Sequence, residues 1–178
     1  MRTEILTIDK GQCLTDVLPA IPANTIFDKT ITGCGATHSE IVNAARHSII
    51  IEPNIPVILG KKAEHPFLFA VYEGITKEDV KAYLAGEHDG YRKIITTPEG
   101  FDKKVLPAMH ELEIPVYKDY FLLFDECEKA IQDVGYRGDI YLPVEDFFKF
   151  ENKAMVSATP IVPSDPRFGE NGFKILKL

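Results

Sequence analysis

The chain alternates between short apolar runs and longer segments with helical periodicity, and this alternation constrains its fold most strongly. The runs are rich in β-branched and aromatic residues, and most are apolar at nearly every position, as strands buried on both faces are. Successive strand–helix units of this kind predict an α/β fold with a mostly parallel sheet and helices on both faces. We expect six strands, at residues 25–28, 48–51, 66–71, 93–96, 120–124 and 153–157. We expect helices at about 37–46, 55–62, 77–84, 99–112, 126–134 and 144–150.

Composition and charge narrow the class of protein further. A length of 178 residues with 45% hydrophobic content suits one domain with a substantial core. No apolar run approaches the roughly 20 residues that span a bilayer, and the N-terminus is charged, so we expect a cytoplasmic protein without a membrane partner. The net charge of −7 disfavours tight nonspecific binding of nucleic acid by this chain alone. Cys13, Cys34 and Cys127 lie far apart and form no CxxC pair, which argues against disulfides and a zinc site.

The segment after the first predicted strand has features of a phosphate-binding loop. Gly33 and Gly35 precede a predicted helix that begins at Thr37, so backbone N–H groups and the positive end of that helix can approach an anion. The phosphate-loop pattern is GxxxxGK followed by Ser or Thr, and residues 30–37 keep its second glycine and its hydroxyl, which suits Mg²⁺. The first glycine is replaced by threonine, and Ala36 occupies the position of the lysine that reaches the phosphates.

The missing lysine either weakens the site or is replaced by another cation. Lys29 is the nearest candidate, although strand alternation could equally direct its side chain away from the phosphates. His38, at the helix start, could touch a phosphate, with an ordinary surface histidine as the alternative. For the loop as a whole, the alternative is a simple tight turn between strand and helix.

An acidic pair, Asp125 and Glu126, directly follows the buried strand expected at 120–124. Ligands gather at the carboxyl ends of strands in open α/β sheets. In nucleotide hydrolysis Asp125 would hold Mg²⁺ and Glu126 would orient or deprotonate the attacking water. Acids at the start of a helix are the alternative explanation. We expect this pair to meet the glycine turn near residue 35 in one pocket, and Ser157 and Thr159, after the next strand, can hydrogen-bond to it.

Taken in order, these segments resemble the first RecA-like domain of superfamily-two helicases and related DEAD-like ATPases, over about residues 24–160. Residues 32–37 are similar to the phosphate loop of that family, 125–128 to its DExx motif and 157–159 to its SAT motif. The resemblance implies a P-loop NTPase fold, ATP and Mg²⁺ as ligands, and a coupling role for Ser157 and Thr159. It places Thr37 and Asp125 at the metal, and Asp125 and Glu126 in catalysis. It also implies that Thr32, Gly33, Cys34, Gly35, Ala36 and Thr37 bind the nucleotide, and the candidate phosphate contacts Lys29 and His38 complete this expected site.

Residues 51–56 and 95–100 are similar to the segments that contact the nucleic-acid strand in that family. The residues implied in this contact are Pro53, Asn54, Thr97, Pro98, Glu99 and Gly100. The expected partners are a nucleic acid, with DNA as the leading candidate, and a second RecA-like domain in a longer protein. We expect residues 1–160 to form the nucleotide-binding domain, and residues 161–178, which carry several Pro and Gly before a strand-like end, to form a linker and the start of the second domain.

Two rival functions belong to other classes. A degenerate P-loop domain could serve as a binding or interaction module that keeps its acids without hydrolysing ATP. A small-molecule kinase is the other, but residues 157–159 suit it poorly. Under the helicase interpretation, the alanine at the lysine position and the lack of a second domain predict weak or undetectable ATP turnover by this chain alone.

Overall fold

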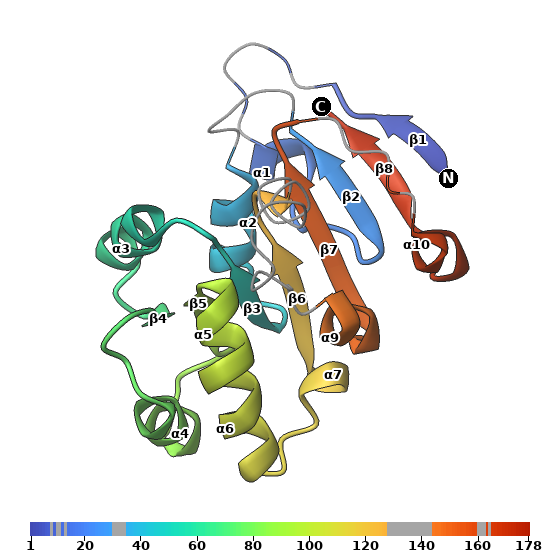
Figure 1. The fold of residues 1–178 in the computed structure, drawn as a ribbon. Helices are drawn as coiled ribbons and strands as arrows, with labels where there is room; N and C mark the ends of the chain where they lie inside the picture. Colours follow the sequence, from blue (N-terminus) through green and yellow to red (C-terminus); the bar gives the residue numbers. More distant parts are fainter. Residues whose placement is uncertain are drawn as a thin grey trace.

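The computed structural model describes residues 1–7, 9, 12, 14–29, 35–127, 144–159, 163 and 165–178. These residues form an eight-stranded sheet with the order β1-β8-β2-β7-β6-β3-β5-β4 (Figure 1). All of the strand pairs are parallel. The strands are β1 (Arg2–Ile5), β2 (Thr25–Asp28), β3 (His47–Ile51), β4 (Phe69–Val71), β5 (Lys93–Thr96), β6 (Tyr120–Phe124), β7 (Asn152–Ser157) and β8 (Lys174–Lys177). The predicted α/β class and parallel sheet are therefore confirmed.

Helices connect these strands. They are α1 (Leu14–Val17), α2 (Ala36–Val42), α3 (Ile55–Glu64), α4 (Lys77–Ala85), α5 (Pro98–Gly100), the π-helical turn η1 (Phe101–Val105), α6 (Leu106–Glu111), α7 (Val116–Asp119), α9 (Val144–Lys149) and α10 (Pro166–Glu170). The segments α5, η1 and α6 follow one another without a break, and the wide π turn ends two residues before Pro107, which has no N–H to donate. Among the described helices, none combines the length and the apolarity needed to cross a membrane.

Two element boundaries differ from the predicted ones by three or four residues, and both differences have local reasons. The helix expected at 37–46 ends at Val42, because the side chain of Asn43 accepts a hydrogen bond from the N–H of Ala45 and so competes with the helical pattern. The strand expected at 66–71 begins only at Phe69, because the N–H of Leu68 is turned back onto the carbonyl of His65. The helix expected at 126–134 lies largely outside the described residues, and Glu126 itself is in a turn.

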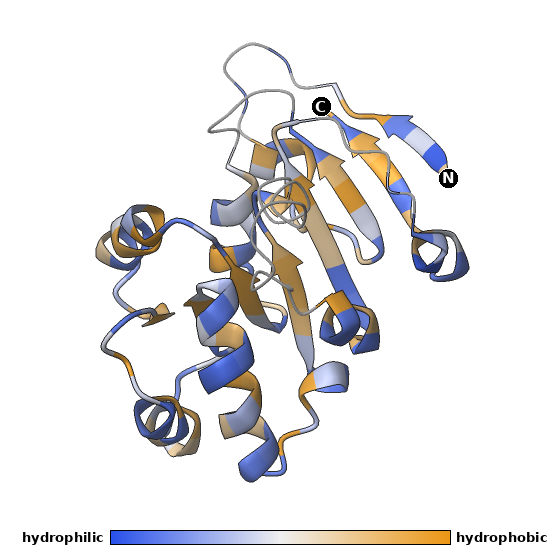
Figure 2. Cartoon of the chain, viewed as in Figure 1, coloured by the Kyte–Doolittle hydropathy of each residue, from blue (hydrophilic) through white to orange (hydrophobic). Residues whose placement is uncertain are grey.

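Each face of the sheet carries its own hydrophobic core. Alternate residues of a strand belong to opposite cores: Ile49 and Ile51 face one cluster, whereas Ile50 faces the other. The helices α4, α6, α7, α9 and α10 cover the first face, and α1, α2 and α3 cover the second. Figure 2 shows the central strands as mostly hydrophobic, with a hydrophilic start on β7, as expected for a sheet covered on both sides. The predicted arrangement of helices on both faces is confirmed.

The C-terminal segment belongs to this sheet. Residues 161–178 were expected to form a linker and the first strand of a second domain, but β8 pairs with both β1 and β2. Phe168 of α10 and Phe173 are almost fully buried in the core of the first face. The apolar side chains that gave this end its strand-like appearance therefore extend the sheet, and β1, which the sequence did not predict, pairs with its outer side (Figure 1).

Candidate functional site

Four central strands end at one edge of the sheet, which we call the carboxyl edge. The ends of β2 and β7 are paired through Asp28 and Ser157, and those of β3 and β6 through Ile51 and Phe124. Because every strand is parallel, the residues that follow these four strands lie on the same side of the molecule, and Figure 1 shows the arrowheads of β2, β7 and β6 pointing the same way. The candidate site is built from these residues.

The glycine turn and the acidic pair meet at the carboxyl edge. Gly35 has the left-handed backbone conformation, with φ 89°, that allows the chain to turn into α2. Thr37, in the first turn of α2, donates a hydrogen bond from its hydroxyl to Oδ2 of Asp125. Both side chains are buried. The predicted convergence of these two segments, 88 residues apart in the chain, is confirmed.

Lys29 directs its side chain into the same site. It directly follows β2, and its Nζ lies 3.0 Å from Oδ1 of Asp125. The side chains are only 11% and 4% exposed, so this is a buried ion pair in which each charge offsets the burial cost of the other. Of the two directions that strand alternation allowed, the ammonium takes the one toward the acidic pair.

A third carboxylate, Glu52, lies beside the acidic pair. It follows β3 and is 1% exposed. Burial is the main cause that raises the pKa of Glu52 to about 7, the charges of Asp125 and Glu126 raise it too, and the N–H of Asn54 opposes them. Glu52 was not among the site residues predicted from the sequence. The available signal was an acid directly after a buried apolar strand, the same signal that identified Asp125.

Asn54 and Glu126 are in direct contact. The side-chain amide of Asn54 donates to Oε2 of Glu126 at 2.7 Å, and its backbone N–H donates to Oε1 of Glu52 at 2.8 Å. Asn54 occupies the N-cap position of α3, yet its side chain caps no N–H of that helix. Glu126 has a positive φ of 48°, which is uncommon outside glycine, and its N–H donates to Oδ1 of Asp125 at 2.9 Å. Asn54, expected to contact nucleic acid, therefore orients the second acid of the pair.

The hydroxyl of Ser157 forms its hydrogen bonds within a local turn. Its hydroxyl donates to the carbonyl of Thr159 at 2.6 Å and accepts the N–H of Thr159 at 3.0 Å. The expected bond from these hydroxyls to the acidic pair is not among the contacts of the described residues. The link runs through the backbone, because the carbonyl of Ser157 accepts the N–H of Lys29 at 2.8 Å.

The other predicted nucleotide-site residues fall into three groups. Thr32, Gly33 and Cys34 lie outside the described residues. Ala36 is 2% exposed and packs in the core of the second face. His38 is exposed, and its Nδ1 lies 3.2 Å from Nε2 of His65 at the surface.

The predicted nucleic-acid contacts lie after β3 and β5. Pro53 is half-buried between Glu52 and Asn54. Thr97 caps α5, because its hydroxyl accepts the N–H of Gly100 at 3.0 Å. Pro98 and Glu99 form the first turn of that helix, and Glu99 pairs with Lys103 at 2.8 Å on the surface.

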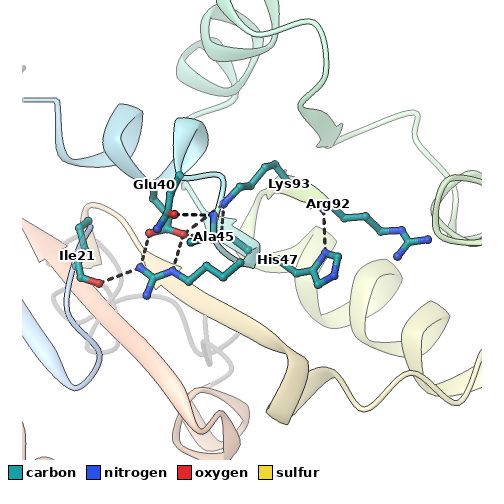
Figure 3. Close-up of polar contacts among 9 residues, drawn as sticks. Ile21, Glu40, Ala45, His47, Arg92 and Lys93 are labelled. Atoms are coloured by element: carbon teal, nitrogen blue, oxygen red, sulfur yellow. Dashed lines mark hydrogen bonds and ion pairs between the residues drawn. The ribbon is translucent and has the colours of Figure 1, made fainter. Parts of the chain in front are cut away.

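A separate buried polar network lies toward the amino ends of β3 and β5 (Figure 3). Glu40 of α2 is fully buried and accepts hydrogen bonds from Arg46 and Ser48, and Nζ of Lys93 lies 3.6 Å from it. Burial lowers the pKa of Lys93 to about 8. The guanidinium of Arg46 also lies 3.4 Å from the ring centre of Phe121. This network fixes α2 to the sheet and, since it lies at the other ends of the strands, it is not part of the candidate site.

No protein-family model matches the chain, and no curated protein is significantly similar to it. The kind of ligand must therefore be inferred from the side chains that the site brings together. Among the described residues, no three His, Cys, Asp or Glu side chains are grouped to hold a metal ion. The contact between the Thr37 hydroxyl and the Asp125 carboxylate nevertheless brings together two oxygen ligands of the kind that Mg²⁺ prefers, and Mg²⁺ commonly completes its shell with water and phosphate oxygens.

Proposed function

We propose that the chain is the nucleotide-binding, RecA-like domain of a helicase-type, nucleic-acid-dependent ATPase with a degenerate phosphate loop. The single observation that carries this proposal is the contact between Thr37 and Asp125. It joins a hydroxyl in the first turn after a glycine turn to an acid at the end of a buried strand, which is the pair that P-loop enzymes use for Mg²⁺.

Each site residue has a role in this proposal. Thr37 and Asp125 would hold the Mg²⁺ that accompanies ATP, and this ion supplies charge neutralisation at the phosphates. Glu126, held by Asn54 at 2.7 Å, would orient the attacking water and accept its proton. The water oxygen would bond to the terminal phosphorus as the bond to the bridging oxygen breaks, which yields ADP and inorganic phosphate. The backbone N–H groups from Gly33 to Thr37 would contact the phosphates.

The order of the central strands supports a link between the nucleotide and a second ligand. Strand β7 lies between β2, which leads into the glycine turn, and β6, which ends at the acids. Its end, Ser157, bonds through its carbonyl to Lys29. The segments after β3 and β5, proposed to hold a nucleic-acid strand, follow strands that end at the same edge. Because the chain carries a net charge of −7, the nucleic-acid strand would be bound by a small local surface or jointly with another domain.

One observation favours the second candidate, a degenerate P-loop domain that acts as an interaction module. Ala36 offers no cation, and its side chain is part of the core. Such a domain would keep Asp125 and Glu126 as structural acids and would bind no nucleotide. Binding measurements separate the two candidates.

The test is a titration of the chain with a fluorescent ATP analogue, with and without Mg²⁺. We expect Mg²⁺-dependent binding that Asp125→Asn weakens at least about tenfold, because the ligand charge is lost while the shape is kept. Asp119→Asn is the matched control, since Asp119 is exposed and immediately precedes β6, at its opposite end. Absence of binding by the unaltered chain would favour the interaction module.

Hydrolysis supplies the second measurement. We expect weak or undetectable steady-state ATP turnover by the isolated chain, with or without single-stranded DNA, because the loop lysine and a second RecA-like domain are both needed for fast hydrolysis. Robust turnover by the chain alone would contradict the proposal of an incomplete site.

A further inference from the structure

We infer that the ammonium of Lys29 contacts the nucleotide phosphates. It takes the place of the phosphate-loop lysine, whose position Ala36 occupies. The inference rests on the proposed nucleotide site and identifies the residue that supplies the positive charge of the missing phosphate-loop lysine. In phosphoryl transfer, a lysine beside the terminal phosphates stabilises the charge that they carry. A site without any such cation would bind the triphosphate weakly.

The position of Ala36 explains why the cation has to come from elsewhere. Ala36 is 2% exposed and packs in the same apolar cluster as Leu14, Phe27 and Ile41. A lysine side chain at this position would have to push an alkyl chain and a charge through that cluster, which costs free energy. The first residue of α2 is thus committed to the core between helix and sheet.

Lys29 is placed where the substitute would be needed. The two oxygens of one carboxylate, Asp125, are divided between its partners: Oδ1 contacts the ammonium at 3.0 Å and Oδ2 accepts the hydroxyl of Thr37. A ligand held by Thr37 and Asp125 would therefore lie within reach of Lys29. An ammonium has three N–H donors, so its contact with Asp125 is compatible with a second contact to a phosphate oxygen.

The other buried lysines of the described residues do not share this location. Lys93 begins β5 and Lys153 is the second residue of β7, so both lie toward the amino ends of their strands. Lys153 donates to the carbonyl of Phe150 at 2.9 Å and to Asn171 at 3.0 Å. Lys29 is therefore the one buried lysine of the described residues at the carboxyl edge, and its backbone N–H is fixed there by β7.

The test compares Lys29→Gln and Lys29→Arg by titration with Mg²⁺–ATP, Mg²⁺–ADP and AMP. Glutamine can still donate a hydrogen bond to Asp125 but carries no charge. We expect Lys29→Gln to weaken Mg²⁺–ATP binding on the order of 10- to 100-fold, the size of a hydrogen bond to a charged group, with a much smaller effect on AMP. Lys29→Arg keeps the charge and should retain most of the affinity. Lys153→Gln, in a buried lysine away from the site, should bind as the unaltered chain does.

The outcomes separate this inference from the proposed function. If the unaltered chain binds no nucleotide, both are overturned. If it binds and Lys29→Gln binds equally well, only the role of Lys29 is overturned. A loss of the same size for all three ligands would show that Lys29 acts through folding alone, and would also overturn its role.

A measurement on the unaltered chain covers the case in which Lys29→Gln does not fold. With lysine side chains labelled for NMR, the Lys29 ammonium signal, assigned from Lys29→Arg, should shift on addition of Mg²⁺–ATP but not of AMP. The signal of Lys153 is the internal control. An unchanged Lys29 signal at saturating Mg²⁺–ATP would overturn the inference.

Discussion

Replacing Glu52 by glutamine should change how the stability of the chain depends on pH. The pKa of Glu52 is raised from 4.5 to about 7, and the residue is 1% exposed, so little solvent screening reduces the effect. A tenfold change in an ionisation constant corresponds to about 1.4 kcal/mol, so the raised pKa corresponds to about 3 kcal/mol. Since the protonated form is favoured in the folded state, its stabilising contribution is fully present below pH 4.5 and is lost as the pH rises through 7.

Glutamine keeps the shape of Glu52 and an oxygen that can accept the N–H of Asn54, but it cannot ionise. We compare the free energy of unfolding of Glu52→Gln with that of the unaltered chain, without Mg²⁺ or nucleotide. This difference should shift in favour of the variant by about 3 kcal/mol between pH 4.5 and pH 8. The assay is urea denaturation followed by far-UV circular dichroism at both pH values. Subtracting the two proteins cancels the contributions of groups that do not interact with Glu52. A stability difference between the two proteins that is the same at both pH values would contradict the raised pKa of Glu52.

A suitable control is Glu64→Gln. Glu64 is exposed, and its hydrogen bond with Lys61 lowers its pKa, so its effect on the pH dependence should be small and of opposite sign.

Two further substitutions test the packing that positions the site. Gly100→Ala should lower the free energy of unfolding by about 1–3 kcal/mol in urea denaturation, because a Cβ there would lie 2.6 Å from Oγ1 of the fully buried Thr96. Gly60→Ala, in a helix with no atom within 4 Å of the added Cβ, should be neutral or stabilising by up to about 1 kcal/mol, and an equal effect at both glycines would contradict the argument. Glu40→Gln leaves two cations of the network in Figure 3 without their carboxylate and should cost about 3–5 kcal/mol, also measured with urea. Glu78→Gln removes a surface carboxylate that is 71% exposed and should cost less than about 1 kcal/mol. A similarly small cost for Glu40→Gln would contradict a structural role for the buried network.

The local pattern of the sequence was sufficient to predict most of the sheet. The strands at 25–28, 93–96 and 120–124 were predicted at their observed bounds, because each is a short run with β-branched or aromatic residues between segments of helical periodicity. The same logic predicted that Asp125 lies at the carboxyl end of a strand and that it meets the turn at Gly35. In an all-parallel sheet, the residues that follow the strands reach a common edge whatever the order of the strands is.

The strands at the outer side of the sheet could not be identified in this way. The segment Arg2–Ile5 is mostly exposed and carries charged residues, so it lacks the apolar pattern of the central strands. Its position depends on β8, which in turn pairs with β2. Such pairing between segments far apart in the chain depends on backbone hydrogen bonds that leave no periodic signal in the side chains.

Residue type and periodicity were enough to predict the class of fold, the residues at the ends of the central strands, and the alanine at the position of the phosphate-loop lysine. Periodicity and residue type are local properties, and they determine which residue follows each strand at the edge of the sheet. Three features became visible only in the folded chain: Lys29 and Thr37 each contact one oxygen of Asp125, Asn54 donates to Glu126, and Glu52 is buried beside them. These contacts join residues 72 to 96 positions apart or depend on burial by several elements at once, so the direction of each side chain follows from the packing of helices and loops around the sheet.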